Sequence, residues 1–191
     1  MISLAETNYA CRGLLRVLRF DSGFVQFFDR SREGALRSFW IYVPLLLLDW
    51  AQIVLLHDPQ APTLTGRMWA ALIIAHIINV FYFPLILLSV GRYIDRANRV
   101  IGCITVYNWL NLLTITLGIP MTLLGWAGAD DNVILIIQVV NIGLVLVCEG
   151  YILAVCLQIS GFFAIGFVAL DFVIGEMLFS VAHLLGRHSL F

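Results

Sequence analysis

Five stretches of the chain consist almost entirely of apolar residues, and short polar segments separate them. A helix needs about 20 residues, at 1.5 Å each, to cross a hydrocarbon core of about 30 Å, and each stretch meets or approaches that length. The pattern therefore predicts an all-α fold, a polytopic membrane helix bundle of about five transmembrane helices. The predicted spans cover residues 39–56, 68–91, 100–126, 133–157 and 161–186.

The segments between the spans contain residues that end helices. Residues 57–67 carry two prolines, and residues 91–99 are charged. Only residues 158–161 separate the last two spans, so these spans are expected to form a tight hairpin. Pro84 and the "GIP" of residues 118–120 fall inside spans, where prolines can interrupt a helix.

The first 38 residues (1–38) are predicted to be a cytoplasmic amphipathic segment, and residues 39–191 form the transmembrane bundle. Arg12, Arg16 and Arg19 share one helical face, and leucines occupy the other. A short helix of this kind lies in the headgroup layer with its guanidinium groups toward anionic lipid. Packing on the end of the bundle is the alternative. The segment has neither the continuous apolar core nor the cleavage site of a secretory signal.

Composition agrees with the membrane assignment. Hydrophobic residues make up 61% of the chain and charged residues 12%, and the mean hydropathy is +0.97. A soluble domain has roughly half apolar and a quarter charged residues. The net charge of -1 argues against a nucleic-acid partner. The expected partners are the lipid bilayer and either other membrane proteins or further copies of this chain.

The placement of the arginines predicts the orientation. All 11 basic residues are arginine; six precede the first span and three lie in residues 91–99, against Arg67 and Arg187 on the other side. Positively charged residues stay cytoplasmic. The N-terminus is therefore expected in the cytoplasm and the C-terminus, after five spans, in the periplasm of a bacterial inner (plasma) membrane.

Polar side chains inside the predicted spans form the candidate site. A charged residue at a helix centre costs roughly 2.5–3.5 kcal/mol, so the acids are expected to face inward, bind a proton or line water. The candidate intramembrane polar residues are Asp49, His76, Asn79, Asn108, Asn111, Glu149, Asp171 and Glu176.

Helical spacing indicates how these residues are grouped. The pairs His76/Asn79 and Asn108/Asn111 each have i, i+3 spacing, which gives one polar stripe per helix, and Gln138/Asn141 repeat it in the fourth span. Glu149 falls within about 20° of that last stripe on a helical wheel. Asp171 and Glu176 are about 140° apart, so one of them alone faces a narrow axis.

Two interpretations of the stripes remain open. In the first, the polar groups join helices by hydrogen bonds and the acids are neutral. In the second, they line a polar cavity or a proton path. Because no arginine or lysine lies inside a span, His76 is the cationic candidate for Asp49 or Asp171.

No motif indicates an enzyme. Nucleotide-binding, zinc-protease and serine-hydrolase signatures are missing from the sequence, and the loops are short. The four cysteines show no metal-ligand spacing. We expect no catalytic residues, no cofactor and no metal.

Three segments resemble those of a group of bacterial five-helix inner-membrane proteins. They are "GLLRVLRFDSGFVQFFDRSREGALRSFWIYVPLLLL", "RYIDRANRVIGCITVYNW" and "LAVCLQISGFFAIGFVALDFVIGEML". The layout, with five spans and the N-terminus inside, is also similar to that of the broader Yip-type proteins. The resemblance implies the fold and assigns no role to Asn108, Trp109 or Asp171, which lie in the best-matching segments.

Two functions are compatible with the sequence. The preferred one is a small accessory or scaffold subunit that binds partner membrane proteins through its N-terminal segment and polar-striped helices. The alternative is a proton- or small-solute-handling transporter or channel that uses the intramembrane stripe. The length of 191 residues is small for a lone transporter, and an odd number of spans excludes a simple two-fold repeat.

Overall fold

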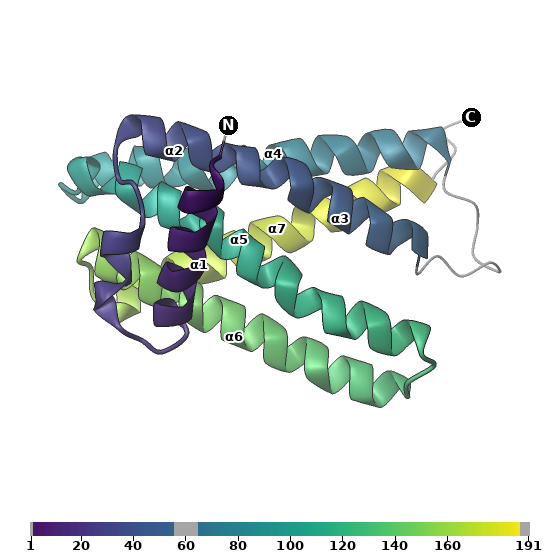
Figure 1. Ribbon diagram of the computed structural model, residues 1–191. Coiled ribbons are helices and arrows are strands. Elements are labelled where there is room, and N and C mark those ends of the chain that lie inside the picture. The colour runs from purple at the N-terminus through teal and green to yellow at the C-terminus, as the bar shows by residue number, and fades with distance from the viewer. Residues whose placement is uncertain (1, 56–64, 188–191) are drawn as a thin grey trace.

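Four long helices lie side by side (Figure 1). The computed structural model describes residues 2–55 and 65–187, without the side chains of residues 49, 52, 53, 55, 186 and 187. Each of the four helices is long and apolar enough to cross a membrane. The chain is thus an all-helical, multi-pass membrane protein over these residues. The four helices are α4 (Gly66–Tyr93), α5 (Ala97–Trp126), α6 (Asp131–Leu157) and α7 (Gly161–Arg187).

The first predicted span corresponds to a shorter helix. The chain runs through α2 (Arg32–Ser38), the 3-10 turn η2 (Phe39–Ile41) and α3 (Tyr42–Leu55). With 14 residues, α3 alone is about 21 Å long, less than the roughly 30 Å of a bilayer core. The proline-containing residues 56–64 lie outside the described part of the chain.

Neither intramembrane proline interrupts its helix. Pro84 lies inside the continuous α4, and Pro120 lies inside the continuous α5. A proline removes one main-chain hydrogen bond, and packing against neighbouring helices makes that loss tolerable in a membrane helix. Pro84 is itself buried, so it has the packing against neighbouring helices that makes the lost hydrogen bond tolerable.

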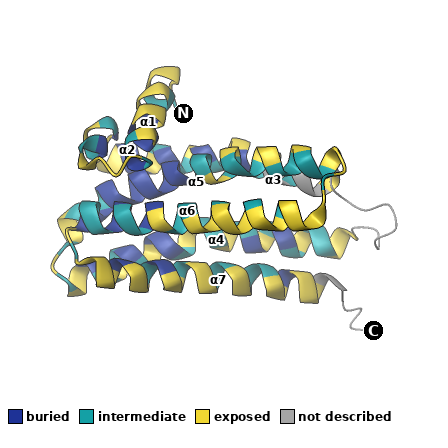
Figure 2. Cartoon of the chain, turned by 90° about the horizontal axis from the view of Figure 1, so that it is seen from below, coloured by how far each residue is buried: buried dark blue, intermediate teal, exposed yellow. Residues whose placement is uncertain are grey.

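Helix α5 is at the centre of the fold and contacts α1, α2, α3, α4 and α6. Its first half is buried, and Trp109 is only 1% exposed. In Figure 2 the buried residues gather where α1 and α2 lie over α5, while α6 and α7 are largely exposed. We call this the arginine-rich end, because the turn of residues 94–96 and the N-terminal segment lie there. We call the opposite end of the bundle the far end.

The N-terminal segment packs on the arginine-rich end. Helix α1 (Leu4–Val17) runs across the long helices (Figure 1) and buries Leu14 and Val17. The turn η1 (Ser22–Phe27) buries Phe24, and the Tyr151 hydroxyl of α6 donates to the Phe20 carbonyl over 2.7 Å. Of the two arrangements that the sequence leaves open, the structure has the segment packed on the bundle.

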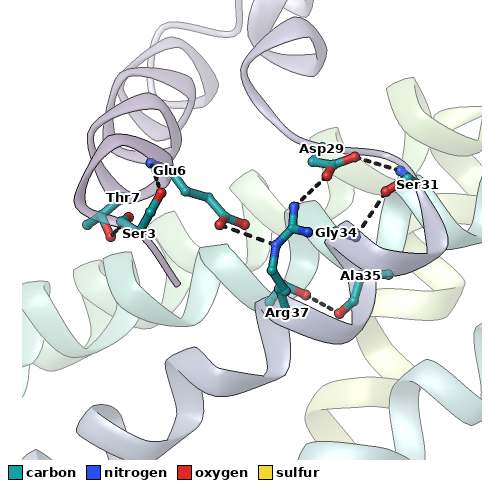
Figure 3. Close-up of polar contacts among 9 residues, drawn as sticks. Ser3, Glu6, Thr7, Asp29, Ser31, Gly34, Ala35 and Arg37 are labelled. Atoms are coloured by element: carbon teal, nitrogen blue, oxygen red, sulfur yellow. Dashed lines mark hydrogen bonds and ion pairs between the residues drawn. The ribbon is translucent and has the colours of Figure 1, made fainter. Parts of the chain in front are cut away.

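One arginine joins α1 to α2 (Figure 3). The Arg37 guanidinium lies 2.6 Å from the Asp29 carboxylate and 3.5 Å from that of Glu6. The Ser31 main-chain N–H also donates to Asp29, over 2.9 Å. The Ser31 hydrogen bonds, with the main-chain N–H first, and then Arg37 hold the pKa of Asp29 below its usual value. Arg37 therefore links α1 to α2 and to the segment that precedes α2.

Candidate functional site

Asp171 of α7 is at the centre of a polar cluster within the long helices. The Tyr107 hydroxyl of α5 donates to Asp171 Oδ2 over 2.9 Å. The Tyr82 hydroxyl of α4 contacts both Asp171 Oδ1 and the Asp171 carbonyl oxygen, the latter over 2.7 Å. Asp171 therefore links three of the four long helices through a single carboxyl group.

The fourth long helix joins this cluster through a second acid. The carboxyl group of Glu149 on α6 lies next to that of Asp171 on α7. Ionised carboxylates only accept hydrogen bonds, so a bond between these two groups would need a proton on one of them. Glu149 is 4% exposed, and its Oε1 atom has no hydrogen-bond partner in the described part of the chain. The two acids therefore form one close pair between α6 and α7.

The pair lies about one third of the way along the long helices from the arginine-rich end. Asp171 follows the start of the 27-residue α7 at Gly161 by ten residues, and Tyr107 follows the start of the 30-residue α5 at Ala97 by the same number. At 1.5 Å per residue, both are about 15 Å from the arginine-rich end. The cluster is therefore well inside the long helices.

A layer of amide and hydroxyl groups adjoins the acids and includes both asparagines of the α5 stripe. Asn108 is fully buried and donates to Ser38 Oγ over 2.9 Å. The Tyr42 hydroxyl donates to Asn108 Oδ1 over 3.2 Å, and Asn111 Nδ2 donates to Tyr42 Oη over 3.0 Å and to the Tyr107 carbonyl over 3.1 Å. These bonds attach α2 and α3 to α5.

His76 and Asn79 line a hollow of about 300 Å³ beside this layer. Tyr42 and Asn111 line the same hollow. His76 Nδ1 lies 3.3 Å from the Leu72 carbonyl, and the ring packs edge-on against Phe179 with centroids 5.1 Å apart. The structure thus brings the α4 and α5 stripes together around one space.

Glu176 lies apart from the Glu149–Asp171 pair. It is exposed on α7 and lines a second hollow, of about 310 Å³, together with Gln138 and Asn141. Asn141 Nδ2 donates to the Leu117 carbonyl over 3.0 Å. Asp49 is also among the predicted site residues, but its side chain lies outside the described residues.

Three tyrosines in the cluster were missed by the sequence analysis. Tyr82 follows Asn79 by three residues and Tyr107 precedes Asn111 by four, so both lie on the stripes already identified. Tyr42, the first residue of α3, had no stripe to mark it. Tyrosine was counted as an apolar residue in the pattern, although its hydroxyl needs a partner when buried.

The three N-terminal arginines that were predicted to contact lipid differ in their surroundings. Arg12 and Arg19 are exposed. Arg16 lies 3.1 Å from the Asp21 carboxylate, and its guanidinium carbon is 4.9 Å from the centroid of the Phe27 ring. Arg16 therefore has partners within the N-terminal segment, whereas Arg12 and Arg19 are exposed.

Among the described residues, no group of three or more His, Cys, Asp or Glu side chains is arranged to hold a metal ion. Comparisons of this chain with protein-family models, with curated proteins and with solved structures find no match. The site must therefore be interpreted from its own chemistry.

Proposed function

We propose that the protein handles protons within the membrane, as a small proton-coupled transporter or channel. The proton-exchanging group is the Glu149–Asp171 pair. The observation that carries this proposal is the pairing of two acids, Glu149 and Asp171, on adjacent membrane-crossing helices, with two tyrosine hydroxyls donating to Asp171. Amide groups would join the helices equally well, at an average of ~0.6 kcal/mol per contact. Only an acid can also release a proton.

Loss of the shared proton would change how the helices pack. With both groups charged, Glu149 and Asp171 would repel each other at close range in a medium of low dielectric constant. The tyrosine hydroxyls on α4 and α5 would continue to donate to Asp171. Helix α6 would therefore separate from α7, while α7 stayed attached to α4 and α5. Proton binding is thereby coupled to helix movement.

Polar groups lie on the route from the pair toward the far end. A Cβ atom added at Gly175 would lie 3.6 Å from Tyr82 Oη and 3.7 Å from Asn79 Oδ1. These two side chains therefore reach α7 at Gly175, one turn from Asp171. Asn79 also lines the 300 Å³ hollow with His76. The hollow is mainly apolar, and the side chains of His76 and Asn79 supply polar groups within it.

The test is proton flux in proteoliposomes that contain the full chain and an internal pH dye. A potassium gradient with valinomycin sets the membrane potential. We expect proton uptake by the wild type, and uptake at the rate of protein-free liposomes for Asp171→Asn and Glu149→Gln. Glu176→Gln is the matched control, because it removes an acid from α7 outside the cluster, and it should keep the wild-type rate. Equal rates for all four proteins would contradict the proposal.

The second candidate function is that of an accessory or scaffold subunit, and Glu176 favours it. Glu176 and Gln138 are both exposed on membrane-crossing helices at the 310 Å³ hollow. A polar group that faces lipid is costly, and a partner helix would cover it. Under this proposal Glu176→Leu and Gln138→Leu would reduce recovery of a protein that co-purifies at fixed ratio, or of a second copy. Asp171→Asn would not reduce it.

We further propose that α3 completes a fifth crossing. Residues 39–55 are continuously helical and span about 25 Å at 1.5 Å per residue. Val43, Leu47 and Val54 on this stretch are exposed, as lipid-facing residues are. Five crossings would put the two termini on opposite sides of the membrane. The arginines at the arginine-rich end favour the cytoplasm for that end and for the N-terminus, and hence the periplasm of a bacterial inner membrane for the C-terminus, the layout of the Yip-type proteins. Thiol labelling from each side of single cysteines at the two termini tests this.

A further inference from the structure

The arginine-rich end contains a cavity of about 560 Å³ that differs from the hollows between the helices. It lies between the connection from η1 to α2, the first turns of α5 and the last turn of α6. Its lining is mainly polar, whereas the hollows around His76 and Glu176 are mainly apolar. The lining residues are Val25, Arg30, Asn98, Arg99, Gly102, Cys103, Val155, Cys156 and Gln158.

The cavity carries positive charge, and no carboxylate is among its described lining residues. Arg30 and Arg99 line it, and Arg96 lines an adjoining hollow of about 240 Å³ that shares Gln158. Neither lining includes a carboxylate. The ion pairs found among the described residues use Arg16 and Arg37. The Arg96 Nε atom is buried and has no hydrogen-bond partner in the described part of the chain.

Two backbone features shape this cavity. A Cβ atom at Gly102 would lie 2.9 Å from Arg30 Cβ and Cγ, so the Arg30 side chain rests directly on the α5 backbone. Gln158, at the end of α6, has a φ of 53°. That left-handed conformation is unfavourable for a residue other than glycine. The side-chain amide of Gln158 therefore lies where the cavity meets the adjoining hollow. A glycine would end the helix here with less strain.

We propose that this cavity and the adjoining hollow bind a phosphate-bearing anion, through Arg30 and Arg99 in the cavity and Arg96 in the hollow. The guanidinium group presents its N–H donors in a planar fork that matches two oxygens of a phosphate. Asn98 and Gln158 add uncharged donors to the same space. The cavity lies where the membrane-crossing helices end, which is the depth of lipid headgroups, and basic pockets between such helices suit anionic headgroups. The ligand is therefore the headgroup of an anionic phospholipid or a soluble phosphate ester.

The first experiment measures thermal stability of the full chain in detergent with three probes. They are short-chain phosphatidylglycerol, inorganic phosphate and, as the uncharged-headgroup control, short-chain phosphatidylcholine at matched ionic strength. A stabilisation by phosphatidylglycerol alone assigns the site to a lipid headgroup. An equal stabilisation by inorganic phosphate assigns it to a soluble phosphate. No stabilisation beyond that of phosphatidylcholine overturns the proposal.

Variants connect the stabilisation to the cavity. Arg30→Gln and Arg99→Gln should each weaken binding of the active probe by about tenfold or more, because each removes a charge-assisted contact. Arg92→Gln is the matched control: Arg92 is exposed at the same end of α4 and lines neither hollow. Equal weakening by Arg92→Gln, or full binding by the Arg30 and Arg99 variants, overturns the proposal.

A second measurement uses a side chain already in the cavity and needs no arginine variant. Cys156 lines the cavity and is partly exposed, whereas Cys103 and Cys148 are buried. In a Cys11→Ser background, an anionic thiosulfonate reagent should label Cys156 faster than a cationic one, and the active probe should slow that labelling. A faster cationic reagent, or no protection by any probe, contradicts an anion site.

Discussion

Glu149 and Asp171, 22 residues apart in the sequence, lie next to each other on the adjacent helices α6 and α7. Tyr82 and Tyr107 donate to the same aspartate from α4 and α5. The carboxyl of Asp171 is therefore a common attachment point for four helices. Its chemistry leads to several measurable consequences.

Replacing Asp171 should test how much of the bundle depends on that attachment. Asp171→Leu leaves the Tyr107 hydroxyl and the Glu149 carboxyl without their partner, at about 1–3 kcal/mol each. We expect the melting temperature in detergent to fall by about 5 °C or more. Asp171→Asn keeps an acceptor oxygen and should stay close to the wild type. A leucine variant as stable as the wild type would show that the cluster does not hold the helices together.

The shared proton should be visible by infrared spectroscopy. At neutral pH we expect the wild type to show the carbonyl stretch of a protonated carboxyl group, because two neighbouring acids can hydrogen-bond to each other only when one of them carries a proton. Glu149→Gln and Asp171→Asn should each remove that band from the difference spectrum. Glu176→Gln should leave it in place. If the wild type lacked the band, the two carboxyl groups would not be sharing a proton.

The contact between α1 and α2 should depend on Arg37 and on pH. Arg37→Gln removes the ion pairs to Glu6 and Asp29, and we expect faster hydrogen exchange of the α1 amides. Because the pKa of Asp29 is lowered on folding, its contribution is complete above the unfolded value of about 3.9 and is lost as the pH falls through the lower, folded value.

Docking of α1 should therefore be unchanged from pH 7 to about pH 5 and weaken only below about pH 4. Arg32→Gln is the control, since Arg32 is an exposed arginine of the same helix outside these ion pairs. Hydrogen exchange of α1 that rose already at pH 6 would assign the docking to other groups.

The turn between α4 and α5 offers a test by complementary substitution. A Cβ atom at Gly91 would lie 2.2 Å from Val100 Cγ2, which no side chain tolerates without movement. We expect Gly91→Ala to cost about 1–3 kcal/mol through overpacking. In a Val100→Ala background the same change should cost little, because the clashing methyl group is gone. Additive losses in the double variant would show that the two residues are not in contact.

Much of the site could be anticipated residue by residue. The i, i+3 spacings placed Asn108 and Asn111 on one face, and the helical wheel separated Asp171 from Glu176; Asp171 is half-buried in the cluster, whereas Glu176 is exposed. Tyr82 and Tyr107 lie on the same stripes but were counted as apolar residues, and Tyr42 had no stripe to mark it. Likewise, no local sequence pattern indicates that Arg30 and Arg99 line the same cavity at the end of the bundle.

The sequence by itself determined that the chain forms long apolar helices, because runs of about 20 apolar residues can satisfy their main-chain groups in lipid only as helices. It also determined which face of each helix is polar, since 3.6-residue periodicity is a property of one helix. Only the tertiary structure decided how the helices are rotated and paired. That rotation depends on side-chain packing between helices. It brought Glu149 against Asp171 and left Glu176 at the surface.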